Sequence, residues 1–563
     1  MSVIDQRRSD LEKTHLAWQP ASLAQRFDAL ATRYADRPFI ITAAGTRTYA
    51  EEQRRSVRLA AGLLALGVER GERVALVMDN RADFAAVKIA IARAGAVAVP
   101  LNFSYRAEEI RERLQAAEAS VLITIDASMA TDFLGVLDTL VPGWPEGVHS
   151  ADLPHLRQVV LAASGVRAGA LDLDGLVSLG ASVSDAQVAD RLAQVGPDDV
   201  CDIVYTSGTT GHAVGATLTH DMLLRSAYGS AYHRGFADGW RVLFSLPMYH
   251  VFGYVEGLLA SMFVGGAIVP HVVFNPRSVL EAIERHRVNE VLFVPTMSVA
   301  VVEQAAAATY DLSSLESVMS AAAPAPVWLW ERVTERLRPS MVFTGYGQTE
   351  VSAATTLTLP GDPIERVAAT VGTMKLGGLA GDPALGGRLA EYRTIDPFSG
   401  AVLPDGTEGE LAVRGPIVTH GYHGDDAATA YSINSDGWLR TGDLGRVDAD
   451  GYVYLTGRSK ELFKVGGELV APVEVERVIT GLPGVEQAFV AGVPDPRFGE
   501  VAWAWVTLQD GVEVTAHDVI RHCRAHLAPF KVPRGVAFLR AADLPMTTTG
   551  KVQKYRLVAE FPR

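Results

Sequence analysis

The chain has 563 residues, of which 48% are hydrophobic and 21% are charged, and this balance excludes wholesale disorder. At about 100–200 residues per domain, such a length predicts several structural units. Acidic residues outnumber basic ones by 65 to 51, which argues against a general nucleic-acid-binding or anionic-membrane-binding protein. The two cysteines, Cys201 and Cys523, are too few for a disulfide framework or a cysteine-rich metal site.

The N-terminal segment, MSVIDQRRSDLEKTH, lacks the apolar stretch of a signal peptide. The longest apolar run, residues 257–270, is too short to cross a bilayer and is interpreted as a buried core segment. Together with the low cysteine content, these features predict a cytoplasmic protein without a membrane span. Because lysine is rare relative to arginine, a retained lysine is a better candidate for a role that needs a mobile point charge.

The first half of the chain alternates between predicted strands and helices. Residues 74–78 and 96–101 are short apolar runs typical of buried parallel strands, and the apolar spacing between them predicts a helix over 84–94. The pattern recurs in a helix over 108–117 and in strands over 120–125, 290–295, 317–320 and 341–344. This alternation predicts α/β layers with parallel sheets.

From about residue 388 the pattern changes to short strands separated by Gly, Asp and Pro turns. The sequence therefore predicts a large N-terminal domain, 1–457, of layered α/β subdomains followed by a β-rich subdomain. Residues 458–563 predict a small α+β domain with a helix over 516–526. The expected fold class is α/β overall.

The most distinctive motif is a loop rich in Gly, Ser and Thr, YTSGTTGHAVG (205–215), which follows an apolar strand. Its glycines allow tight turns that expose backbone N–H groups, and its hydroxyls add further donors, so the loop is suited to holding phosphate. It is not a Walker A loop, and a flexible polar linker is the alternative. The residues expected to contact phosphate are Thr206, Ser207, Gly208, Thr209, Thr210 and Gly211.

The loop resembles the phosphate loop of the adenylate-forming (ANL) superfamily, which includes acyl- and aryl-CoA synthetases, luciferases and peptide-synthetase adenylation domains. Four further motifs match in order: GYGQTE (345–350), GWLRTGD (437–443), GRSKELFKVGGELVAPVEVE (457–476) and PMTTTGKVQK (545–554). The resemblance covers roughly residues 20–555, and the subgroup is the acyl/aryl-CoA synthetases of the 4-coumarate–CoA ligase type. It implies two steps: an acid and ATP form an acyl-adenylate and pyrophosphate, and CoA then displaces AMP.

The resemblance implies the nucleotide site. Thr349 is expected to donate to the α-phosphate, Glu350 to bind Mg²⁺ and Asp443 to accept the ribose hydroxyls. Arg458 would contact ribose or phosphate, and Lys551 matches the catalytic lysine that reaches the α-phosphate and carboxylate oxygens. Joining two anions needs such neutralisation, although each residue alone resembles an ordinary surface charge. Further nucleotide contacts are expected from Ala322, Ala323, Gly345, Tyr346 and Gly347.

Residues 458–563 resemble the small mobile lid domain that rotates between the two half-reactions. Lys460 matches the hinge position of the family. Lys464, Gly466 and Gly467 match the segment that lines the CoA tunnel, with a simple glycine turn as the alternative.

His250 lies in the apolar segment LPMYHVFGY, where the family places an aromatic or histidine gate beside the carboxylate. Without the resemblance, a buried core histidine would be the simpler interpretation. The segment lacks the aspartate of amino-acid-activating relatives, which argues against an amino-acid substrate. Ala321 replaces a glycine of many aryl-CoA ligases and suggests a narrower pocket. The acid pocket is expected to be lined by Tyr249, His250, Val251, Ala321 and Gly345.

The chain departs from the family pattern at two places. The phosphate loop of the family usually ends in Pro-Lys-Gly, but here it reads Ala213-Val214-Gly215, so the loop lysine is absent. Its absence puts normal ATP affinity or rate in doubt. A glycine-rich insert at 375–387 is expected to form a surface loop or a cover over the site.

We expect an ATP-dependent acid–CoA ligase that acts on an aryl or medium-chain acyl acid and uses ATP, Mg²⁺ and CoA. One alternative passes the acid to a separate acyl-carrier protein, and another activates an unusual acid such as nitrite for N–N bond formation. A degenerate nucleotide-binding protein is the third, and the retained motif residues argue against it. The expected partner is a small-molecule acid and not nucleic acid, and the expected assembly is a monomer or homodimer.

Overall fold

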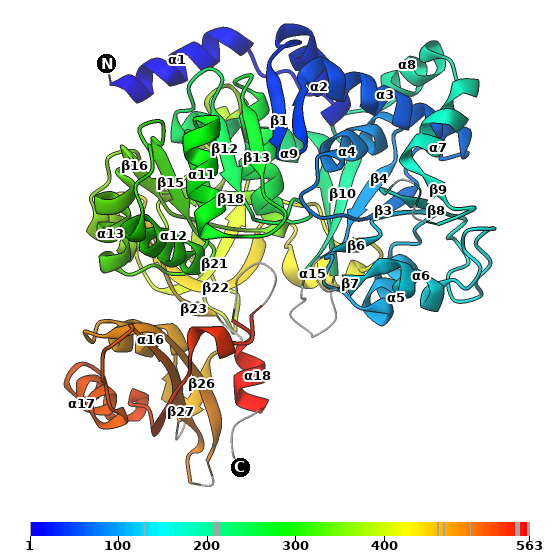
Figure 1. The fold of residues 1–563 in the computed structure, drawn as a ribbon. Helices are drawn as coiled ribbons and strands as arrows, with labels where there is room; N and C mark the ends of the chain where they lie inside the picture. The colour runs from blue at the N-terminus through cyan, green and yellow to red at the C-terminus, as the bar shows by residue number, and fades with distance from the viewer. Residues whose placement is uncertain are drawn as a thin grey trace. The chain divides into compact units, whose positions relative to one another are not determined.

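The computed structural model describes residues 2–128, 131–163, 165, 167–206, 214–458, 461–465, 468–495, 497–546 and 552–559 (Figure 1). The chain forms two compact units. Unit 1 comprises Met1–Val367, Gly372–Glu391 and Arg414–Leu439, and unit 2 comprises Ala368–Val371, Tyr392–Val413 and Arg440–Arg563. None of the helices in the described ranges is both long and apolar enough to span a bilayer.

Unit 1 contains a first seven-stranded sheet, parallel except at the β1–β2 edge. In spatial order its strands are β16 (Met341–Phe343), β15 (Ser317–Ser320), β14 (Glu290–Phe293), β12 (Arg241–Phe244), β13 (Ala267–Pro270), β1 (Pro38–Thr42) and β2 (Gly45–Thr48). The strands from β15 to β13 are buried along their length except at Arg241, because helices cover the sheet.

A second seven-stranded sheet in unit 1 is also mainly parallel. In spatial order its strands are β11 (Val214–Thr219), β10 (Val200–Thr206), β4 (Val97–Pro100), β3 (Arg73–Val77), β5 (Val121–Thr124), β8 (Gln158–Leu161) and β9 (Leu171–Asp172). Strands β10 and β11 pair antiparallel, so residues 207–213 of the predicted phosphate loop connect two neighbouring strands. Residues 207–213 themselves lie outside the described part of the chain.

The helices of unit 1 flank these sheets (Figure 1). They are α1 (Val3–His15), α2 (Leu23–Arg33), α3 (Tyr49–Ala65), α4 (Asp83–Arg93), α5 (Ala107–Ala116), α6 (Phe133–Leu140), α7 (Leu173–Leu179), α8 (Asp185–Ala193), α9 (His220–Arg234), α10 (Ala260–Met262), α11 (Pro276–His286), α12 (Pro295–Ala307), α13 (Val327–Leu337) and α15 (Asp426–Ser432), with α14 (Ile364–Ala369) crossing the boundary between the units. Ser22, Thr48 and Ser184 begin their helices as N-caps, because each side chain accepts a hydrogen bond from the first turn.

Two smaller features of unit 1 lie beside α9, which contacts both. One is the π-helix η2 (Phe252–Leu259). The other is the three-stranded antiparallel sheet of β17 (Gly345–Gln348), β18 (Ala353–Leu357) and β19 (Thr373–Met374), in which the 3₁₀ helix η3 (Thr349–Val351) joins β17 to β18. The remaining short elements are β6 (Ala127–Ser128), β7 (Thr131–Asp132), η1 (Gly180–Ser182), η4 (Gly378–Ala380) and η5 (Pro383–Leu385).

Unit 2 holds two further sheets. The first has the order β20 (Glu391–Ile395), β21 (Gly409–Arg414), β22 (Leu439–Val447) and β23 (Val453–Arg458). The second has the order β25 (Glu468–Val470), β24 (Phe463–Val465), β27 (Gly499–Leu508) and β26 (Val485–Asp495), with β28 (Gly535–Phe538) paired to β27. Its helical segments are α16 (Pro472–Thr480), α17 (Ala516–His526), α18 (Lys554–Ala559), η6 (Pro529–Lys531) and η7 (Ala541–Asp543).

The mixed α/β fold expected from the sequence is confirmed. The predicted helix over 84–94 is α4, the predicted strand over 317–320 is β15, and the predicted helix over 516–526 is α17. The domain boundary predicted near residue 460 stays a prediction. The expected role of the retained lysines is wrong for Lys88 and Lys375, whose side chains are buried and ion-paired, Lys88 with Asp202.

His233, a buried histidine of α9, is expected to make the stability of unit 1 depend on pH. His233 accepts a hydrogen bond at Nδ1 from the Leu376 N–H (3.1 Å), and its Nε2 lies 3.1 Å from the Thr358 carbonyl. A neutral imidazole with its proton on Nε2 therefore has a hydrogen-bond partner at each ring nitrogen. Burial lowers the pKa of His233 to about 3, far below its ordinary value of 6.5.

We expect the protein to lose stability as the pH falls below 6.5. In that range His233 becomes protonated in the unfolded chain but stays neutral in the folded chain, so protonation favours the unfolded state. At pH 5 the loss from His233 amounts to about 2 kcal/mol in the free energy of unfolding. Melting temperatures at pH 7 and pH 5, compared between the wild type and His233→Gln, measure it. The variant should show a smaller drop between the two pH values, and an equal drop would contradict the assignment.

Candidate active site

The predicted acid-pocket residues follow neighbouring strands of the first sheet. Strands β12, β14, β15 and β16 are parallel neighbours, so their carboxyl ends meet at one edge (Figure 1). The segment of Tyr249–Val251 comes after β12, Ala321 directly follows β15, and Gly345 comes after β16. The fold thereby brings the three predicted pocket segments to the same edge.

His250 lies in a turn that is fixed by backbone contacts. Its N–H donates to the Pro247 carbonyl, and its own carbonyl accepts from the Tyr254 N–H, both at 3.1 Å. Its Nδ1 accepts from the Phe252 N–H at 3.3 Å, which leaves the proton of a neutral imidazole on Nε2. Asn80 braces the preceding loop through its contacts with Leu246 and Met248. The half-buried imidazole is therefore held in one orientation at the start of η2.

The segment after β15 combines a buried wall with an unusual backbone. Ala321 is buried and donates its N–H to the Phe293 carbonyl, while Ala322 and Ala323 are exposed. Ala322 has φ of 72°, a left-handed conformation that costs a non-glycine residue about 1–2 kcal/mol. Such strain persists only where the surroundings determine the backbone, and it is concentrated in binding and catalytic sites. The strained residue is one of those predicted to contact the nucleotide.

The GYGQTE motif requires its glycines because the backbone approaches β18 closely. A Cβ on Gly347 would lie 1.8 Å from the Ala353 carbonyl oxygen, and one on Gly345 would lie 2.5 Å from the Thr356 carbonyl oxygen. Larger residues are therefore excluded at both positions. The tight pairing of β17 with β18 leads directly into η3, which carries Thr349 and Glu350, both buried.

The Glu350 carboxylate lies among oxygen groups. Its Oε1 accepts from the Tyr422 hydroxyl at 3.2 Å and from the Thr206 hydroxyl at 3.4 Å. Burial and the neighbouring carboxylate raise the pKa of Tyr422, so its hydroxyl stays a hydrogen-bond donor at every physiological pH. Thr206 is the last residue of β10, directly before the predicted phosphate loop. An oriented carboxylate at this position fits Mg²⁺, which prefers oxygen ligands and one or two carboxylates together with substrate phosphates.

In unit 2, Asp443 and Arg458 form a pair. They are cross-strand partners on β22 and β23, and Arg458 Nε lies 3.0 Å from Asp443 Oδ1. The side chain of Asp443 is 9% exposed, whereas that of Arg458 is 56% exposed. Two residues predicted from separate motifs are therefore neighbours, and the guanidinium compensates the charge of the carboxylate.

Several predicted site residues lie outside the described part of the chain. For Lys464 the backbone is described in β24, but its side chain is not. The predicted residues that lie outside are Ser207, Gly208, Thr209, Thr210, Gly211, Lys460, Gly466, Gly467 and Lys551. Their roles stay predictions.

Sequence reasoning missed Tyr422, which belongs to no motif that we singled out, and it misjudged the insert at 375–387. The insert begins with Lys375, whose buried side chain reaches α9, and it continues with the buried Ala380, whose carbonyl accepts from Arg225 of α9. It is therefore anchored on α9 and is not a loose surface loop. Its glycines were the misleading signal, because Gly377, Gly378 and Gly381 allow close packing and not mobility.

Residues 27–423 match the model of the AMP-binding enzyme family, and residues 474–551 match that of the AMP-binding enzyme C-terminal domain. The chain belongs to the AMP-binding enzymes. Within this family it is an adenylate-forming enzyme of the acyl-CoA synthetase type, an AMP-forming acid–thiol ligase that uses ATP and CoA.

Two relatives and one solved structure illustrate the similarity of this AMP-binding enzyme to known proteins. It is 38% identical over 498 residues to a propanoyl:CoA ligase of Mycobacterium tuberculosis whose propanoyl group carries a methyl-dioxo-octahydroindenyl ring system, covering 88% of this chain and 90% of that protein. It is 35% identical over 519 residues to the feruloyl-CoA synthase of an Amycolatopsis species, covering 91% and 94%. The anthranilate CoA ligase AuaEII, solved with anthranoyl-AMP, superposes with a TM-score of 0.81 at 25% identity over 97% of this chain and 98% of that one.

Proposed function

We propose that this acid–CoA ligase activates a largely apolar carboxylic acid, aryl or medium-chain acyl, at the carboxyl edge of the first sheet. The observation that carries the proposal is that the segments of Tyr249–Val251, Ala321 and Gly345 follow neighbouring parallel strands, with Tyr249, Val251 and Ala321 buried. Gly345 begins the GYGQTE motif, which ends in the Thr349–Glu350 turn. The relatives with a ring-bearing propanoyl, a feruloyl or an anthranoyl group support a bulky apolar acid.

In the first half-reaction, a carboxylate oxygen of the acid attacks the α-phosphorus of ATP, and the bond to the pyrophosphate oxygen breaks. Thr349 would donate its hydroxyl to the α-phosphate, and Asp443 would accept the ribose hydroxyls. Glu350 would hold Mg²⁺, which neutralises phosphate charge when bound. A donor that is already directed at the α-phosphate would need no rearrangement as negative charge shifts to the leaving group, and such preorganisation lowers the barrier.

In the second half-reaction, the thiol sulfur of CoA attacks the acyl carbon of the adenylate. The bond between that carbon and the phosphate oxygen breaks, AMP leaves with the bonding electrons, and the thiol proton passes to solvent. Lys464, Gly466 and Gly467 are the proposed CoA contacts and Lys460 the proposed hinge. A monomer or homodimer acting in the cytoplasm remains our expectation.

The decisive experiment measures AMP and pyrophosphate release with ATP and Mg²⁺ across an acid panel, with and without CoA. The panel contains aryl, medium-chain and branched acids, and nitrite with an aromatic amine. We expect CoA-dependent AMP release with one class of apolar acid. Release that responds only to a holo-carrier protein, or only to nitrite, would replace the proposal by that alternative. No release with any acid would overturn it.

A further inference from the structure

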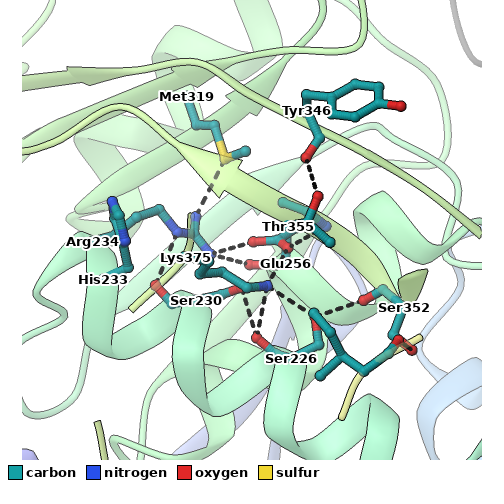
Figure 2. Close-up of polar contacts among 12 residues, drawn as sticks. Ser226, Ser230, His233, Arg234, Glu256, Met319, Tyr346, Ser352, Thr355 and Lys375 are labelled. Carbon is teal, nitrogen blue, oxygen red and sulfur yellow. Dashed lines mark hydrogen bonds and ion pairs between the residues drawn. The ribbon is translucent and has the colours of Figure 1, made fainter. Parts of the chain in front are cut away.

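Two basic and two acidic side chains are buried together in unit 1, and Figure 2 shows three of them, Lys375, Glu256 and Arg234. This charge cluster consists of Lys375, Glu256, Arg234 and Glu290, each at most 1% exposed. Lys375 Nζ lies 3.5 Å from Glu256 Oε1, and Arg234 contacts Glu256 at 3.3 Å and Glu290 at 2.6 Å. Two cations thus face two anions. Burying four charges costs several kcal/mol per ion before compensation, so a fold that needed only stability would favour apolar residues here.

The Lys375 ammonium is fixed to helix α9. It donates to the Ser226 hydroxyl at 2.9 Å, to the Ser226 carbonyl at 3.1 Å and to the Ser230 hydroxyl at 3.0 Å. Burial lowers the pKa of Lys375 to about 8, so the side chain stays charged at neutral pH. The attraction of Lys375 and Arg234 lowers the pKa of Glu256, which stays ionised as well. Lys375 therefore links η2 to α9, by an ion pair with Glu256 and by hydrogen bonds to Ser226 and Ser230.

Glu256 connects η2 to the strand beside the GYGQTE motif. Its Oε1 accepts from the Ala354 N–H of β18 at 3.2 Å. Ala354 is the cross-strand partner of Gly347 on β17. At the other end, η2 starts two residues after His250, whose carbonyl accepts from the Tyr254 N–H. One carboxylate thus fixes the distance between the histidine segment and the proposed nucleotide strand.

Ser226 carries the contact onward to the Thr349–Glu350 turn. Its hydroxyl accepts from Lys375 and donates to the Ser352 carbonyl at 2.6 Å (Figure 2). Ser352 closes the turn by donating its N–H to the Thr349 carbonyl at 3.0 Å. Its φ of 56° is unfavourable for serine, so external contacts must hold it in place. The hydrogen bond from the Ser226 hydroxyl is one of them, and Lys375 in turn donates to that hydroxyl.

We propose that Lys375 and Glu256 are positioning residues for adenylate formation. Through Ala354 and Ser352 they hold the His250 segment and the Thr349–Glu350 turn in register with each other. A π-helix is an uncommon element that is frequent at functional sites, and here it carries the glutamate that makes the connection. The inference rests on the proposed function, because the roles of the positioned residues are proposed there.

Two double variants separate positioning from stability. Lys375→Met/Glu256→Gln and Lys375→Met/Glu256→Met each remove one cation and one anion, so both leave a balanced cluster. Only the glutamine keeps an oxygen that can accept from the Ala354 N–H. Acid-dependent exchange of pyrophosphate into ATP, assayed with the best acid of the panel, reports adenylate formation, and melting temperature reports stability.

We expect the Met/Met variant to show kcat/KM for exchange about tenfold below that of the Met/Gln variant at a similar melting temperature, which corresponds to one lost hydrogen bond. A purely structural role predicts exchange rates that follow melting temperature across the single and double variants. Equal kcat/KM in the two double variants would overturn the proposal.

Two single variants complete the experiment, one as a control and one as a second test. Glu52→Gln removes a buried carboxylate of α3 that pairs with Arg47 at 3.3 Å, outside the charge cluster. It should change the KM for the acid by less than twofold. Ser226→Ala keeps the charges and tests the second connection if the double variants do not fold. It should raise the KM for ATP several-fold, and an unchanged KM would contradict the proposal. A wild type without acid-dependent exchange contradicts the proposed function and, with it, this inference.

Discussion

Replacing Glu350 by glutamine is expected to slow adenylate formation by about 10²–10³-fold, the range found when one preorganised charge-stabilising group is removed from a reaction that develops charge. Glutamine keeps the shape and can still accept from the Tyr422 hydroxyl, which lies 3.2 Å from Oε1. The lower rate of the variant therefore measures the contribution of the negative charge of Glu350, separately from that of its shape. Acid-dependent pyrophosphate exchange at increasing Mg²⁺ concentration measures the effect. The variant should need more Mg²⁺ and should not regain the wild-type rate at saturation.

Tyr422→Phe tests the orientation of the same carboxylate without removing it. Groups that orient a metal ligand typically change metal affinity by about 10–100-fold, and the lost hydroxyl donates to Oε1 of Glu350. We expect a Mg²⁺ requirement about tenfold higher and a near-normal rate at saturation. Glu365→Gln, on the exposed face of α14, is the matched control and should behave as wild type. A Mg²⁺ requirement equal in Glu350→Gln and wild type would contradict the metal-ligand role.

The elements that could be predicted from the sequence are those with a local signal. The apolar run before the phosphate loop is β10, and the apolar helix predicted between β3 and β4 is α4, whose residues 84–93 are all buried. The glycines of GYGQTE were recognised from the motif, and the structure adds the reason, a backbone approach that leaves no room for a Cβ on Gly347. These features depend on residues close together in sequence.

The remainder of the site depends on contacts between residues far apart in sequence. Lys375 and Glu256 are separated by 119 positions, and Tyr422 and Glu350 by 72. Neither pair carries a local pattern, since a lysine in a glycine-rich segment resembles a surface loop. The register of β22 with β23 likewise places Asp443 opposite Arg458, a pairing that two separate motifs did not reveal. Only the folded topology decides which charges meet.

Replacing Lys551 by alanine is expected to lower acid-dependent pyrophosphate exchange by about 10²–10³-fold, because it removes the cation proposed to reach both the α-phosphate and the carboxylate. Lys551 matters more here than in relatives that also have a lysine in the phosphate loop, because Val214 occupies that loop position in this chain. No lysine lies between Lys88 and Lys375, so none near Val214 in sequence replaces the absent loop lysine. The synthesis of thioester from preformed acyl-adenylate and CoA should be nearly unaffected, because pyrophosphate has already left.

Lys554 offers a matched control three residues away. Its ammonium is fixed by Glu461 and Glu476, each at 2.7 Å, so it serves as a structural cation in unit 2. Lys554→Ala should lower the melting temperature through the loss of these contacts and leave exchange close to the wild-type rate. If Lys551→Ala exchanges normally while Lys554→Ala does not, the catalytic cation is misassigned within the motif. If both half-reactions fall equally in Lys551→Ala, the lysine supports folding or nucleotide binding, because a group needed only for adenylate formation cannot slow a step that begins after it.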